Sequence, residues 1–82
     1  MDLDEIRSEI DKIDDELVRL FCQRMHVAAQ VADYKKANNL PIFQPARERA
    51  KLQDVAEKAG PEMANYTRVL YSMLFELSRS YQ

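Results

Sequence analysis

The feature that most constrains the fold is a row of apolar residues at heptad spacing along the first part of the chain. The row consists of Leu3, Ile6, Ile10, Ile13, Leu17, Leu20, Val27, Val31 and Tyr34. Apolar residues three and four apart lie on one face of an α-helix. Residues 3 to 35 contain no Gly or Pro that would break a helix. The pattern therefore predicts one helix from about Asp2 to Asn38, with Lys35 and Lys36 at the end that favours cations.

Two shorter helices are predicted from the few helix-breaking residues. Pro45 suits the first turn of a helix, because its missing N–H costs nothing there. Gly60 followed by Pro61 indicates a helix end. We predict a second helix over residues 45–59 and a third from Pro61 to the end of the sequence. No strand pattern is seen, so the predicted class is all-α, in one domain of residues 1–82.

Each shorter helix also has a row of residues along one face. In the second helix the row is Glu48, Leu52, Val55 and Ala59. In the third it is Met63, Tyr66, Leu70, Met73, Leu74 and Leu77, continued by Ser78 and Gln82. Because Glu48 begins an apolar row, we expect its side chain to point inward.

The predicted first helix is too long for a compact chain of this size. A helix of roughly 37 residues measures about 55 Å, whereas a compact globule of this length has a radius of gyration of about 12 Å. The apolar row nevertheless runs the full length of the helix, so something must cover the overhanging part. A second copy of the same chain is the simplest candidate. A break that folds the helix back is the alternative, but no Gly or Pro favours it. We therefore expect an intertwined helical homodimer.

Composition argues against several classes of protein. The 82 residues are 46% hydrophobic and 32% charged, which is typical of a folded domain and not of a disordered one. A formal net charge of −2 gives no reason to expect nucleic acid or an anionic membrane as a partner. A single cysteine, Cys22, cannot form an internal disulfide, and no signal peptide or long apolar run is seen. A cytoplasmic location is expected.

Cations within the apolar row of the first helix are candidates for a binding site. An unpaired charge at Arg24 would be costly, so it must pair with a carboxylate, either of a ligand or of a protein residue such as Glu76. Lys35 lies three turns further on nearly the same face, about 16 Å away between Cα atoms, so the two cations can converge on a small anion. Arg7 has the same heptad position as Lys35 but lies about 42 Å away along the helix. It could therefore reach the same ligand only from a second chain.

The other helices add further polar candidates. Arg47 and Glu48 lie in the first turn of the second helix, and Ser78 and Gln82 form a polar pair at i, i+4 in the third. Several cations with one acid and neutral hydrogen-bonding groups suit the binding of a dicarboxylate and the stabilisation of charge that develops on it.

Plainer interpretations exist for each of these residues. Lys35 and Lys36 could be ordinary cations at a helix C-terminus. Arg47 and Glu48 could be solvated first-turn charges, and the Ser–Gln pair could belong to a frayed helix end. No nucleophile–base pair or metal-ligand spacing is visible, since the chain has one histidine and one cysteine. No cofactor is expected.

Seven stretches of the sequence resemble the small, all-helical class of chorismate mutases. They are LDEIR (3–7), IDKIDDEL (10–17), QRM (23–25), VADYKK (31–36), PI (41–42), PARER (45–49) and FELSRSYQ (75–82). The resemblance covers essentially the whole chain. It implies three helices per chain, two interlocked chains and two equivalent sites. It also implies an isomerase that converts chorismate to prephenate in phenylalanine and tyrosine biosynthesis, by a one-substrate [3,3] rearrangement without a cofactor.

The resemblance also implies a role for each candidate residue. Arg24 would bind a substrate carboxylate, as would Arg7 from the other subunit. Lys35 and Gln82 would hydrogen-bond the ether oxygen, where negative charge grows as the C–O bond breaks. Glu48 would hold the ring hydroxyl.

Three further positions complete the implied site. Arg47 would support the carboxylate end, and Ser78 would be a nearby hydrogen-bond donor. Gln44 stands where the family usually has Asp before Pro45. Gln caps a helix poorly, so this departure puts one contact in doubt.

Three alternatives remain on the sequence alone. Isochorismate-pyruvate lyases share the fold and resemble the first helix, but tend to lack the Arg47–Glu48 pair and the final Gln82. A helical dimerisation or regulatory module could have kept the fold without the chemistry, although every key position is filled. The chain could also be the mutase portion of a larger fused enzyme.

Overall fold

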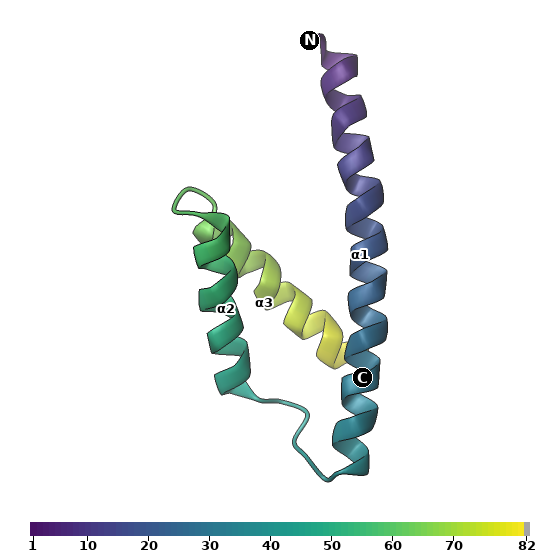
Figure 1. The fold of residues 1–82 in the computed structure, drawn as a ribbon, viewed down its shortest axis with the longest axis vertical. Helices are drawn as coiled ribbons and strands as arrows, with labels where there is room; N and C mark the ends of the chain where they lie inside the picture. The colour runs from purple at the N-terminus through teal and green to yellow at the C-terminus, as the bar shows by residue number, and fades with distance from the viewer. Residues whose placement is uncertain (82) are drawn as a thin grey trace.

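The computed structural model describes residues 1–81, and within them the chain forms three α-helices and no strand (Figure 1). Helix α1 spans Leu3–Ala37, α2 spans Pro45–Ala59 and α3 spans Ala64–Tyr81. The predicted all-α class and the order of the helices are confirmed. Gln82, a predicted site residue, lies outside the described residues.

Helix α1 is continuous, as the absence of Gly and Pro predicted. The Asp2 side chain caps its start by accepting the Glu5 N–H at 2.8 Å. Asn38 follows the last turn, and its backbone N–H donates to the carbonyl of Tyr34 at 3.1 Å. Asn39 then adopts a left-handed conformation with φ 55°, which Asn tolerates better than most residues. The helix therefore ends at the pair of asparagines, and no internal break folds it back.

Helix α2 has the predicted bounds, whereas α3 begins later than predicted. Gln44 precedes α2 and makes no side-chain capping hydrogen bond, in line with its poor capping ability. Gly60 ends α2 with φ 85°, where an L side chain would be strained. Residues 61–63 form a turn in which the Met63 N–H donates to the Gly60 carbonyl at 3.2 Å. Because this tight turn occupies those residues, α3 starts at Ala64 and not at Pro61.

The three helices form an elongated molecule with principal extents of 55 × 26 × 16 Å (Figure 1). Helix α2 packs against α3, and α3 in turn contacts α1. The N-terminal part of α1 projects beyond both of the other helices (Figure 1). The radius of gyration is 15.8 Å, well above the roughly 12 Å of a compact chain of this length. The predicted overhang of the first helix is therefore present.

The core of the single chain is thin. The buried residues of the described part are Ala32, Val55, Ala56 and Ser78. The α2 row points inward as predicted, with Val55 buried and the other three members partly buried. In contrast, every apolar member of the α1 row is between 43% and 64% exposed. Most of the predicted α3 row is also exposed, because α3 is rotated so that Tyr71 and Phe75, which are outside the row, face α1 together with Ser78, the buried member of the row.

None of the described helices combines the length and the apolar character needed to cross a bilayer.

Candidate active site

A groove of about 750 Å³ lies between the three helices. It is lined by Leu20, Gln23, Arg24, Val27, Ala28, Val31, Lys35, Ile42, Gln44, Arg47, Glu48, Lys51, Tyr71, Phe75, Ser78 and Arg79. Six of the predicted site residues are among them: Arg24, Lys35, Gln44, Arg47, Glu48 and Ser78. The fold thus brings side chains from all three helices, and from the loop between α1 and α2, into the same groove.

Arg24 enters the groove from α1 and is held by α3. Its guanidinium donates a hydrogen bond to Ser78 Oγ at 2.9 Å and lies 5.8 Å from the centre of the Tyr71 ring and 5.7 Å from that of Phe75. Glu76, the protein carboxylate considered as a partner, is exposed and forms no ion pair with Arg24, so that pairing is wrong within the chain. None of the ion pairs among residues 1–81 involves Arg24. Its remaining N–H donors suit a carboxylate that a ligand would bring.

Lys35 enters the groove from the last turn of α1, just before the loop that leads to α2. Its Nζ donates to the backbone carbonyl of Ile42 at 3.1 Å, and the side chain is partly buried. The neighbouring Lys36 is exposed and does not line the groove. An ammonium group fixed to a carbonyl still has two donors that can face a ligand.

Glu48 lies in the first turn of α2 and forms an ion pair with Arg79 of α3. Its side chain is 24% exposed, so it is not simply a solvated first-turn charge. Arg47, the preceding residue, is exposed but also lines the groove. Gln44 lines the groove just before α2, and its carbonyl accepts the Glu48 N–H at 3.2 Å.

Arg79 is a groove residue that the sequence analysis missed as a candidate. Besides its ion pair with Glu48, its guanidinium lies 4.8 Å from the centre of the Phe43 ring. The two partners belong to α2 and to the loop before it, far from Arg79 in the sequence. The one sequence feature that could have pointed to Arg79 as a groove residue was its position directly after Ser78. That position does not indicate which residues Arg79 contacts.

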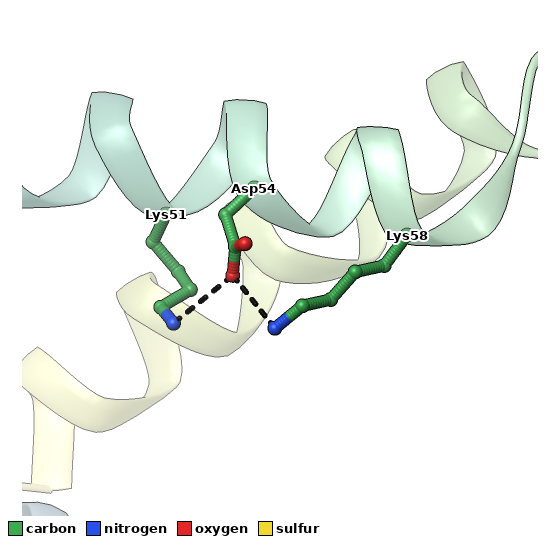
Figure 2. A network of polar contacts seen from close by, with 3 residues as sticks. All are labelled: Lys51, Asp54 and Lys58. Carbon is green, nitrogen blue, oxygen red and sulfur yellow. Dashed lines mark hydrogen bonds and ion pairs between the residues drawn. The ribbon is translucent and has the colours of Figure 1, made fainter.

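Lys51 is a second groove residue that the sequence analysis missed. Figure 2 shows its contact with Asp54, which Lys58 shares. It lies one turn after Arg47 on α2, and its Nζ is 3.4 Å from Oδ2 of Asp54. The same oxygen receives the Nζ of Lys58 at 3.0 Å. The hydrogen bond from Lys58, with a smaller one from Lys51, holds the pKa of Asp54 below its ordinary value. The single negative charge of Asp54 is thus shared between two lysines. Because Lys58 already balances that charge, Lys51 adds positive charge to the groove wall.

The groove is strongly basic although the chain is slightly acidic. Among its described lining residues five are Lys or Arg and Glu48 is the one acid. The formal charge of the whole chain is −2. Neither Cys22 nor His26 lines the groove, and no cluster of metal-ligating side chains is found among the described residues. Such a wall concentrates an anionic ligand and stabilises negative charge within it.

Arg7 is not brought to this groove by its own chain. It lies exposed near the start of α1, about 42 Å along the helix from Lys35. Of the eight predicted site residues, six therefore line the groove, Arg7 does not, and Gln82 lies outside the described residues.

Comparisons with curated proteins identify relatives of the chain. It is 48% identical over 61 residues to the T-protein of Haemophilus influenzae. It is 46% identical over 48 residues to the bifunctional chorismate mutase/prephenate dehydratase of Aquifex aeolicus. It is 40% identical over 47 residues to the chorismate mutase of Methanocaldococcus jannaschii. The matches cover 71%, 58% and 57% of the chain and 16%, 13% and 48% of these relatives, respectively, so the chain spans less than half the length of each.

No solved structure matches the chain significantly. Its assignment therefore depends on the sequence relatives and on the comparison with protein families. Residues 6–82 match the family described as chorismate mutase type II, which is nearly the whole chain. The resemblance seen in the seven stretches of sequence is confirmed, and the chain belongs to the chorismate mutase type II family.

Proposed function

We propose that the chain converts chorismate to prephenate, as an isomerase that acts without a cofactor in phenylalanine and tyrosine biosynthesis. The observation that carries this proposal is the groove whose basic side chains come from all three helices and surround a single described acid. Chorismate has two carboxylates, an ether oxygen and a ring hydroxyl. A groove with several fixed cations and one carboxylate complements that set of groups.

The proposed mechanism needs binding and electrostatics and no covalent step with the protein. Arg24 binds one carboxylate, and the apolar groove residues around it hold the substrate in its compact, reactive conformer. As the C–O ether bond breaks and the new C–C bond forms, negative charge grows on the ether oxygen. Lys35 donates to that oxygen and stabilises the transition state more than the ground state. Glu48 accepts a hydrogen bond from the ring hydroxyl.

We further propose that the working form is a homodimer with shared sites. The exposed apolar row of α1 supports this, because a second copy would remove it from water. The position of Arg7 supports it as well: it is too far from Lys35 to share a ligand within one chain. In the dimer, Arg7 of each chain would bind the second substrate carboxylate in the groove of the other.

The first experiment measures the loss of chorismate absorbance and identifies the product. The wild type should form prephenate, and Arg24→Ala and Lys35→Ala should each lower kcat/KM by about 10²–10³-fold while helix content is retained. Lys36→Ala is the matched control, because Lys36 adjoins Lys35 but is exposed outside the groove. Turnover of isochorismate but not chorismate would favour the lyase alternative. Near-normal turnover by both groove variants would remove the site assignment.

Subunit mixing tests the shared site directly. Arg7→Ala and Lys35→Ala chains, each inactive alone, should regain activity when mixed, since one site of each mixed dimer contains both native residues. Random exchange makes half of the dimers mixed, so about a quarter of the wild-type activity should return. No recovery after exchange has been verified by mass spectrometry would contradict the shared site.

A further inference from the structure

The ion pair between Arg79 and Glu48 joins α3 to α2 across the groove. Glu48 is the one acid among the described lining residues, and other cations line the same groove. Arg47 precedes it, and Lys51 follows at i+3, a spacing at which side chains on a helix meet. Its carboxylate nevertheless pairs with Arg79, with side chains that are 24% and 33% exposed, respectively. The orientation of Glu48 is thus set from a different helix.

Arg79 is itself held on two sides. Its Cζ lies over the Phe43 ring, at 4.8 Å from the ring centre, and one of its N–H groups donates to Glu48. Phe43 belongs to the loop between α1 and α2, so Arg79 links this loop, α2 and α3. A planar guanidinium can stack and donate at once, whereas a lysine ammonium cannot reproduce both contacts.

We infer that Arg79 is a positioning residue, which holds Glu48 so that its free oxygen faces the substrate hydroxyl. The ion pair uses Oε2 of Glu48, which leaves Oε1 for the ligand. Without Arg79, the carboxylate would turn toward Arg47 or Lys51 of its own helix, and the hydroxyl would lose its acceptor. This inference depends on the proposed chorismate mutase activity, in which Glu48 holds that hydroxyl.

Two other roles would produce different kinetics. If Arg79 bound a substrate carboxylate itself, its loss would act independently of Glu48 and would raise KM. If the ion pair only joined α2 to α3, its loss would lower stability and leave kcat of the folded enzyme unchanged. A positioning role requires a loss of kcat that disappears when Glu48 has already been replaced.

The test is a double-mutant cycle of Glu48→Gln and Arg79→Met, with kcat and KM measured on chorismate for the full chain. We expect Arg79→Met to lower kcat by about 10- to 100-fold, with KM changed by less than about threefold. In the Glu48→Gln background the same replacement should change kcat by less than about threefold. Arg79→Lys should restore part of kcat, because it keeps the charge and loses the stacking.

Arg68→Met is the control, since Arg68 lies on the same helix, contacts Asn65 and does not line the groove. It should leave both kinetic constants unchanged.

Losses of Arg79→Met and Glu48→Gln that multiply in the double variant, or that appear only in KM, would overturn the positioning role. If Arg79→Met loses helix content, the cycle is carried out with Arg79→Gln, which also removes the charge, and the same criteria apply. A wild type without chorismate turnover would overturn the proposed function and this inference together, whereas an active wild type with additive losses would overturn the inference alone.

Discussion

Replacing Ile13 by Ala tests whether a second chain covers the apolar row of α1. In the single chain Ile13 is 63% exposed. Full burial of such a side chain is worth about 1.5–3 kcal/mol, so covering the exposed part is worth about 1–2 kcal/mol per chain. A symmetric dimer contains the residue twice. The change should therefore cost the dimer about 2–4 kcal/mol, or about 30- to 1000-fold in its Kd.

The control for this prediction is Val18→Ala. Val18 lies on the same helix and is 62% exposed, but it is not a member of the heptad row. Sedimentation equilibrium over a series of concentrations gives Kd for the wild type and both variants, and circular dichroism reports helix content. Equal effects of the two replacements would refute the reasoning. A wild type that sediments as a 9.6 kDa monomer at every concentration would refute it as well.

Three further outcomes are expected from single replacements. Gln44→Asp should raise the free energy of unfolding by about 0.5–2 kcal/mol in urea titrations, because Asp caps α2 where Gln makes no capping bond; an unchanged midpoint would contradict the capping argument. Gly60→Ala should lower the free energy of unfolding by about 1–3 kcal/mol, since a Cβ meets open space but φ is +85°; a stability equal to the wild type would exclude strain at this turn. Asp54 has a lowered pKa, so its stabilising contribution is fully present above its ordinary pKa of 3.8 and is lost as the pH falls through the lowered value. Thermal unfolding followed at decreasing pH should therefore show a smaller acid-induced loss in Asp54→Asn than in the wild type, and parallel curves would contradict the effect.

Local patterns in the sequence were sufficient to predict the helices and many of the site residues. The unbroken row of α1, the asparagine pair after it and the Gly60 stop all act within one or two helical turns, so they can be recognised without knowing the fold. The spacing of Arg24 and Lys35 placed both on one face of α1 for the same reason. The choice of Glu48 also came from a local pattern, because it begins the apolar row of α2. Arg47 was a candidate from its place in the first turn of α2, Gln44 was assigned by resemblance, and the fold places both on the groove wall.

Contacts between helices could not be predicted in the same way. Arg24 donates to Ser78, which is 54 positions away, and not to Glu76, because the rotation of α3 turns Ser78 inward and leaves Glu76 exposed. The partner of Glu48 is likewise set by how α3 lies against α2. A shift of α3 by one residue would rotate its side chains by about 100° and change both partners, although its helical periodicity would be the same. Periodicity determines which residues share a face of a helix, whereas packing between helices determines which faces meet.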